Sequence, residues 1–506
     1  MRAIGALRLW LWPGTRSIKL SARPSGCAEW GTEFARGRQQ TVEAWLMGPK
    51  LVRRIFLAAV LSVQLCCMGS PPQAGTPEGF ASTGRRLQVT AGTDGTPGGS
   101  TFNRISSALM VAQPGDTLVL REGRYQESID FPRSGEPGRP IVLMAQPGET
   151  VVLDGGKMSI PRWQGVVNIL NRSHIVVEGI QVINSNQRGI VAYSRNGTAS
   201  GILLRNCRVT RTADAGIVLE RVRASRLESC EAGYAAGGSP GFLINQSQDI
   251  EIVGCRAHHN GLGGGGTAQG FLVYEGTRIR LQNCVAEDNV RDGFDIGGGD
   301  IGATEVSVRQ CVSRRNGEDG VGINSQAREV TVQQCLLAFN GENAVNIYQG
   351  AQSIKLYNNT FVGHVHYLWI DGSDLPERPI ADLEVVNCIG YGASSRAIVT
   401  VAPLGKVKFD YNCWTGEKRG YGEFCLWEMG PGEKAFGFAD LGEGGRWSRL
   451  LGQGEHSFSA DPRFVDPGNQ NFQLTRESPC VDAGTPVGLP YLGRAPDLGA
   501  FELTQE

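Results

Sequence analysis

The chain has 506 residues, a net charge of −1 and 41% hydrophobic residues, so it is long enough to bury a large core. Residues 1–54 hold ten Lys or Arg against three Glu, which leaves residues 55–506 with a net charge of −8. This acidic balance argues against nucleic acid as a partner, and an acidic protein acting on an acidic polymer would need local cations. Glycine, at 70 residues, is about twice as frequent as usual, which is typical of a chain that turns often.

The N-terminal part is composite. Residues 1–46 have no coherent pattern, and we interpret them as an over-extended start or an unstructured segment, with Met47 as the true start. Residues 47–74 predict a secretory signal peptide, because basic residues up to Arg54 precede a short apolar run over residues 55–65. That run is too short for a membrane span, so we expect a secreted or cell-surface protein. Lipidation at Cys66 or Cys67 is an alternative, although Val63-Gln64-Leu65 lacks the small residue expected before a lipidated cysteine.

A lead-in and a helix come next. Residues 75–100 are rich in Gly, Thr and Pro. Residues 101–112 place four apolar residues on one helical face: Ile105, Ala108, Leu109 and Ala112. We expect this short helix to cap the open end of a solenoid, because an uncovered terminal strand invites aggregation.

One short phrase then repeats along the chain. It ends in a cysteine and recurs at intervals of 23 to 29 residues, with Asn359 replacing the cysteine once: Cys207, Cys230, Cys255, Cys284, Cys311, Cys335 and Cys388. A second apolar run follows each phrase, as in residues 293–296. A short repeat of alternating strands without helical periodicity predicts an all-β, single-stranded, right-handed parallel β-helix over residues 101–401. Residues 402–506 are expected to form an irregular C-terminal tail packed on it.

The cysteines predict a core column rather than a disulfide framework. Seven of them occupy one repeat position, and stacked strands lie about 4.8 Å apart, so their side chains would line up inside the coil. An unpaired cysteine behaves there as a small buried hydrophobe. Disulfides between adjacent coils are the alternative. Cys413 and Cys425 lie outside the column and could pair in an exported protein.

Aligning the repeats predicts polar columns on neighbouring coils. The expected columns are Asp292, Asp319 and Asn343; Arg291, Glu318 and Glu342; Asp295, Gly322 and Asn346; and an asparagine ladder of Asn289, Asn316 and Asn340. Carboxylates one coil apart disfavour joint ionisation, and Ca²⁺ would relieve the conflict with oxygen ligands. We therefore predict calcium ligands at Asp292, Asp295, Asp319 and Glu318. The alternative is that these residues are solvated turn residues that bond their own backbone.

Three segments resemble secreted β-helix proteins. Residues 94–98, 112–125 and 140–149 resemble the opening of pectate lyases of the pectate lyase L type. The segment Asn289-Val-Arg-Asp-Gly-Phe-Asp-Ile296 is similar to the calcium segment of that family. Residues 461–467, 478–484 and 497–502 resemble a C-terminal signature of exported bacterial β-helix proteins.

The resemblance implies calcium-assisted β-elimination on a uronate polymer such as pectate, started by a lysine that removes the C5 proton. It assigns Asp292 and Asp295 as calcium ligands, whereas Arg291 replaces the first aspartate of the motif and Gly322 occupies the lysine position. Arginine serves as the base in some β-helix lyases, so the nearby candidates for that role are Arg314, Arg315 and Arg328.

The expected partner is an acidic polysaccharide bound by a monomer. Aromatic side chains on a solenoid face suit sugar stacking, so we expect substrate contacts from Tyr274, Tyr348, Trp369 and Asn346. Two alternatives stay open: a glycoside hydrolase or epimerase on the same fold, and a non-catalytic glycan-binding or structural surface protein.

Overall fold

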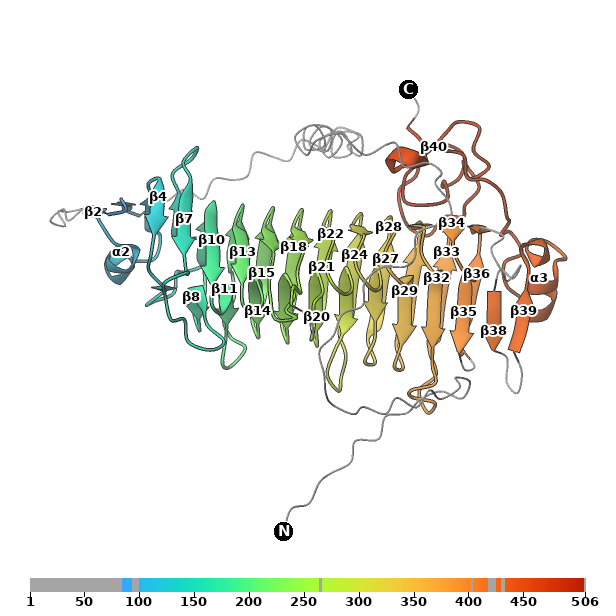
Figure 1. Cartoon of the computed structure of the whole chain (residues 1–506), viewed down its shortest axis with the longest axis horizontal. Helices are drawn as coiled ribbons and strands as arrows, with labels where there is room; N and C mark the ends of the chain where they lie inside the picture. Colours follow the sequence, from blue (N-terminus) through green and yellow to red (C-terminus); the bar gives the residue numbers. More distant parts are fainter. Residues whose placement is uncertain are drawn as a thin grey trace, which may run out of the picture. The chain divides into compact units, whose positions relative to one another are not determined.

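The computed structural model describes residues 84–92, 100–263, 266–401, 404–416, 425–428 and 433–504. The predicted start segment, the signal peptide, and Cys66 and Cys67 lie outside the described residues. The strands of the coil visit three sheets in turn, here named A, B and C. Each sheet stacks its strands in chain order, except at the start of sheet A, where the second strand lies outside the first (Figure 1). One passage through the three sheets makes one coil of a parallel β-helix.

Sheet A has fourteen strands. They are β1 (Arg86–Val89), β2 (Thr101–Phe102), β3 (Thr117–Leu120), β6 (Ile141–Ala145), β9 (Ile175–Glu178), β12 (Leu203–Arg205), β15 (Arg223–Glu228), β18 (Gln248–Val253), β21 (Thr277–Gln282), β24 (Thr304–Arg309), β27 (Arg328–Gln333), β30 (Gln352–Tyr357), β33 (Ala381–Val386) and β36 (Val407–Asp410). Sheet B has twelve strands. They are β4 (Gly123–Tyr125), β7 (Val151–Asp154), β10 (Ile180–Ser185), β13 (Arg208–Thr212), β16 (Glu231–Gly233), β19 (Arg256–His258), β22 (Val285–Glu287), β25 (Val312–Arg314), β28 (Leu336–Ala338), β31 (Thr360–Val362), β34 (Ile389–Ala393) and β37 (Cys413–Gly416).

Sheet C has thirteen strands and carries the candidate site. They are β5 (Ile129–Asp130), β8 (Gly165–Leu170), β11 (Arg188–Tyr193), β14 (Ile217–Glu220), β17 (Phe242–Asn245), β20 (Phe271–Tyr274), β23 (Phe294–Gly297), β26 (Val321–Ile323), β29 (Asn343–Tyr348), β32 (His366–Asp371), β35 (Ile398–Val401), β38 (Cys425–Glu428) and β39 (Glu433–Phe436). Only the last pair, β38 with β39, is antiparallel among the described strands of this sheet.

Single residues with left-handed backbone turn the chain between sheets. Gln310 (φ 52°) precedes Cys311 at the bend from sheet A to sheet B, and Asn283 (φ 54°) does so one coil earlier. Arg315 (φ 52°) precedes Asn316 at the bend from sheet B to sheet C. This region carries a steric cost that is smallest for Gly, Asn and Asp, and the residue before each repeat cysteine is Asn, Ser, Gln or Gly.

The core confirms the cysteine and asparagine columns. The seven repeat cysteines are buried and unpaired. Phe271 stacks between Phe242 and Phe294 at centroid distances of 4.7 and 5.0 Å. Asn289 and Asn316 are buried, and the Asn289 Nδ2 donates to Asn316 Oδ1 at 2.8 Å. The ladder thus satisfies polar backbone groups at a buried bend that sheet hydrogen bonds cannot reach.

The predicted disulfide between Cys413 and Cys425 does not form. Cys413 and Cys425 are both unpaired, because Cys413 begins β37 in sheet B whereas Cys425 begins β38 in sheet C. The Cys413 Sγ instead donates to the backbone carbonyl of Ala460 at 3.3 Å.

Both ends of the described solenoid are covered. The expected N-terminal helix is α2 (Ile105–Val111), which buries Ile105, Ala108 and Leu109. The C-terminal segment packs against sheet B, where Phe464, Phe472 and other apolar side chains cover β28, β31 and β34. That segment contains η1 (Phe438–Asp440), α3 (Arg446–Leu451), β40 (Phe464–Asp466), η2 (Pro467–Asn469) and β41 (Asn471–Leu474). Among the described helices, none is long and apolar enough to cross a membrane.

Candidate functional site

Polar side chains gather on the outer face of sheet C, across β23, β26, β29 and β32. The observed register pairs Asp295 with Gly322, Gly322 with Asn346, and Asn346 with Trp369. Alternate residues of a strand point to opposite faces, and the residues between them, such as Ile296, Ile323 and Ile347, are buried in the core. The column predicted from the repeat is therefore confirmed, and it faces outward.

A second column lies where the chain enters sheet C. The backbone N–H of Asp319 donates to Asp292 Oδ1 at 2.9 Å, and the backbone N–H of Asn343 donates to Asp319 Oδ1 at 3.0 Å. Asn343 in turn lies beside His366, whose Nδ1 is 3.0 Å from Asn343 Oδ1. Asp292, Asp319 and Asn343 are each about 5% exposed. The stacking of Asp292, Asp319 and Asn343 is therefore confirmed, and His366 extends it.

Asp295 is held by amide donors above a position that lacks a side chain. Gln269 Nε2 donates to Asp295 Oδ2 at 2.7 Å, and Asn324 Nδ2 donates to Asp295 Oδ1 at 2.5 Å. A Cβ placed on Gly322 would lie 3.5 Å from Asp292 Oδ2 and 3.6 Å from Asp295 Oδ1. Both carboxylates thus face the same point above Gly322, and glycine leaves that point open.

Burial and mutual repulsion govern the charges of this cluster. Burial raises the pKa of Asp292 well above its ordinary range, and the charges of Asp295 and Asp319 add to the rise. Burial raises the pKa of Asp295 to about 6, although Asn324, Arg291 and Gln269 oppose it. Burial also raises the pKa of Asp319. Close carboxylates with raised pKa values are an arrangement that a bound cation would stabilise.

The donor chemistry fits calcium. Two buried side-chain oxygens border the aspartates without any hydrogen-bond partner: Gln269 Oε1 and Asn346 Oδ1. The nitrogen of Gln269 binds Asp295, and that of Asn346 donates to Asp319 Oδ2 at 2.8 Å, so these oxygens belong to the same cluster. Ca²⁺ takes carboxylate and amide oxygens with loose geometry. Within the described ranges, no three histidine, cysteine or carboxylate side chains form a ready metal-binding group, so amides, water or a ligand would have to complete the shell.

Glu318, the fourth predicted ligand, is engaged elsewhere. Its Oε2 accepts from Arg291 Nε at 2.7 Å, and Arg291 also donates to the carbonyl of Gly266 at 3.2 Å. Arg291, which replaces an aspartate of the family motif, therefore forms an ion pair at the rim of the cluster.

The three arginines proposed as bases have other partners. Arg314 Nε donates to Glu287 at 2.8 Å, and Arg315 Nη2 donates to Asp288 at 2.8 Å, both beside sheet B. Arg328 begins β27 in sheet A and donates to Thr304 Oγ1 at 3.2 Å. In the described part of the chain, no hydrogen bond joins these arginines to the three aspartates. Their catalytic role stays a prediction without support from geometry.

The predicted sugar contacts lie on this same sheet. Tyr348, in β29, is close enough that the charges of Asp295, Asp292 and Asp319 add to the effect of burial in raising its pKa. Trp369 packs beside His366 at 5.1 Å. Tyr274, in β20, is 37% exposed and precedes the aspartates by one coil. The sheet therefore carries three aromatic side chains along one face.

Sequence reasoning missed Gln269 and Asn324, and it considered His366 as a surface residue that could face sugar without assigning it to the site. Gln269 lies in a long Gly-rich segment before β20, where repeat lengths differ and alignment is weak. His366 could have been found from the spacing, because it occupies the position of Asn343 on the next coil. Burial lowers the pKa of His366 to about 4, so its imidazole is neutral at neutral pH.

Comparison with known proteins agrees with the β-helix fold. Residues 87–318 match the family described as Pel9A-like, right handed beta helix region. The chain is a right-handed parallel β-helix protein that resembles pectate lyases. No curated protein matches the sequence.

Solved structures with a similar coil include several proteins that act on polysaccharides. The pectate lyase Pel9A is 17% identical, with 83% of this chain and 97% of that chain covered and a TM-score of 0.46. The A-module of the mannuronan C-5 epimerase AlgE6 from Azotobacter vinelandii is 14% identical, with 71% and 94% covered and a TM-score of 0.54. A rhamnogalacturonan lyase is 17% identical, with 65% and 87% covered and a TM-score of 0.41. At these identities the shared property is the fold.

Proposed function

We propose that this pectate lyase-like protein is exported and binds a uronate polymer, such as pectate, along the outer face of sheet C. The observation that carries the proposal is the open point above Gly322, which Asp292 and Asp295 both face. Unpartnered amide oxygens beside them add to a donor set made only of oxygen. Calcium, when bound there, would neutralise the carboxylate of a uronate.

The protein's own residues would position the polymer. Asp292, Asp295 and Asp319 would bind the cation. Gln269 and Asn324 keep the Asp295 carboxylate in place through hydrogen bonds. Trp369 offers an apolar ring to a sugar face, next to His366. The polymer would run across successive strands, because Asp295 and Trp369 lie in one outward column and the other two aspartates lie in the column beside it.

We propose lyase chemistry in which His366 accepts the C5 proton. The neutral imidazole donates from Nδ1 to Asn343 Oδ1, which leaves Nε2 as an acceptor. As the C5 proton moves to Nε2, the electron pair forms the C4–C5 double bond and the C4–O bond breaks. Tyr348, which its raised pKa keeps protonated, would donate a proton to the departing oxygen. His366 lies two coils from Asp319, about 10 Å, so a single uronate would have to bridge the two, with its carboxylate toward the cation side and its C5–H toward His366.

The alternative is a glycan-binding protein without catalysis. The observation in its favour is Gly322 itself, because the lysine that the resemblance leads us to expect is missing and the arginines are engaged elsewhere. Incubation with polygalacturonate and alginate in the presence of Ca²⁺ separates the two proposals. Lyase activity produces unsaturated uronates that absorb in the ultraviolet, and His366→Gln should abolish them while binding persists. Binding without unsaturated products from any uronan would support the alternative.

A further inference from the structure

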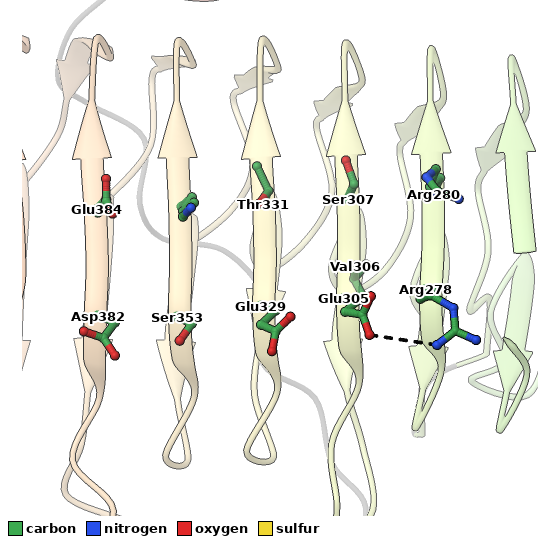
Figure 2. Close-up of a pocket in the computed structure, with 11 residues that line it drawn as sticks. Arg278, Arg280, Glu305, Val306, Ser307, Glu329, Thr331, Ser353, Asp382 and Glu384 are labelled. Atoms are coloured by element: carbon green, nitrogen blue, oxygen red, sulfur yellow. Dashed lines mark ion pairs between the residues drawn. The ribbon is translucent and has the colours of Figure 1, made fainter. Parts of the chain in front are cut away.

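The outer face of sheet A carries an elongated groove that the uronate site does not use. It crosses β21, β24, β27, β30 and β33, and its volume is 560 Å³ (Figure 2). Four strand spacings of about 4.8 Å make it about 19 Å long, parallel to the axis of the coil. Sheets A and C are different faces of the coil, so this groove is a separate surface.

Two rows of side chains line the groove (Figure 2). One row follows the strand register: Arg280, Ser307, Thr331, Lys355 and Glu384. The other row consists of residues with left-handed backbone at the start of each strand: Arg278, Glu305, Glu329, Ser353 and Asp382. The groove therefore offers a hydrogen-bonding side chain from each row on every coil.

Several of these groups are uncommitted. Arg278 binds Asp249 at 2.6 Å, so its charge is already paired. Among the described residues, neither Arg280 nor Lys355 forms an ion pair, and both are exposed. Glu329 and Asp382 are also exposed and without an ion pair in that part of the chain. Free donors and free acceptors thus alternate over the groove.

The charges of the groove and its lack of apolar surface indicate which class of ligand fits it. Three cationic and four anionic side chains line the groove, so neither a polyanion nor a polycation is matched along its length. A polymer with a carboxylate on each unit would meet Glu305, Glu329 and Asp382 in turn. The only apolar lining residue is Val306, whereas a protein interface needs an apolar centre. Hydroxyl groups, which donate and accept, match such a mixed set of partners.

We propose that this groove binds a linear neutral glycan, whose hydroxyl groups pair with Arg280, Lys355, Glu329 and Asp382 across the hydroxyls of Ser307 and Thr331. The site would attach the protein to a neutral polymer. It does not depend on the proposed lyase function, because it shares no residue with sheet C.

Calorimetric titration of the whole protein with cellohexaose, xylohexaose, mannohexaose and hexagalacturonate tests the proposal. At least one neutral hexasaccharide should bind, and EDTA and Asp295→Asn should leave this binding unchanged. The double variant Arg280→Ala/Lys355→Ala should weaken it by about tenfold or more, because hydrogen bonds to charged groups are lost. Lys408→Ala is the matched control, since Lys408 is exposed in the same outward row one strand beyond the groove.

The proposal is overturned if none of the three neutral hexasaccharides binds. It is also overturned if the double variant binds them like the wild type, or if hexagalacturonate displaces them from the groove. Loss of uronan cleavage in the sheet C variants bears on the proposed lyase alone.

Discussion

Replacing Asp295 with asparagine tests the charge balance of the uronate site. The substitution keeps the shape of the side chain and removes a carboxylate that faces the same point as Asp292. An asparagine oxygen can still accept from Asn324. Its nitrogen would face Gln269, whose buried Oε1 lacks a partner and could accept after the amide turns over. We therefore expect the variant to fold.

The expected gain follows from the pKa. Burial raises the pKa of Asp295 from its ordinary value of 3.8 to about 6. A carboxyl whose pKa is raised by folding stabilises the fold when protonated, and this stability is lost as the pH rises from the unfolded to the folded pKa. The cost of ionising it is thus absent below pH 3.8 and reaches about 3 kcal/mol above pH 6. Without calcium, Asp295→Asn should raise the free energy of unfolding by that amount at neutral pH.

The assay is urea unfolding followed by tryptophan fluorescence, with EDTA or with calcium, at several pH values. Calcium should stabilise the wild type by about 2.7 kcal/mol at a hundred times its dissociation constant, and should stabilise the variant much less. Asp374→Asn is the control, because Asp374 is exposed and lies in a turn. Its effect should stay within about 0.5 kcal/mol.

Two results would refute this reasoning. One is a variant that is less stable than the wild type by more than about 1 kcal/mol in EDTA at neutral pH, since that would mean the carboxylate is net stabilising. The other is an unchanged response to calcium, which would remove Asp295 from the ligand set.

Three further predictions concern the stability of the β-helix and the binding of uronan on sheet C. Asn316→Ala should lower the free energy of unfolding by about 2–4 kcal/mol, because it leaves the Asn289 N–H and other buried groups without partners, and Gln282→Ala should change it little. Although burial opposes its ionisation, nearby arginines lower the pKa of Glu287 to about 2. Glu287→Gln should therefore lower the free energy of unfolding by about 3 kcal/mol at neutral pH, and this loss should vanish as the pH falls from 4.5 to 2. An equal loss at pH 2 and pH 7 would contradict the prediction. Trp369→Ala should weaken uronan binding by about tenfold if its ring stacks on sugar, as measured by titration, whereas a change below twofold would remove it from the site.

The fold could be predicted in detail because it is periodic. The repeated cysteine, the turn residue before it and the asparagine at the next bend each occupy one place per coil, so Cys284, Gln310 and Asn316 could be placed without a structure. The same ruler predicted that Asp295, Gly322 and Asn346 share a column. It failed where periodicity failed, at Gln269 and at the supposed pair of Cys413 and Cys425, because segment lengths near these residues follow no repeat.

Spacing along the chain was enough to predict the coil and its core columns, because one repeat corresponds to one coil and equivalent residues become neighbours. Which of the surface side chains are free to bind a ligand depends on the folded molecule. Arg314, Arg315 and Arg328 have the right charge and proximity in sequence, yet their guanidinium groups meet Glu287, Asp288 and Thr304. Whether a polar group is available depends on partners contributed by other coils and on burial, and both are properties of packing in space rather than of order along the chain.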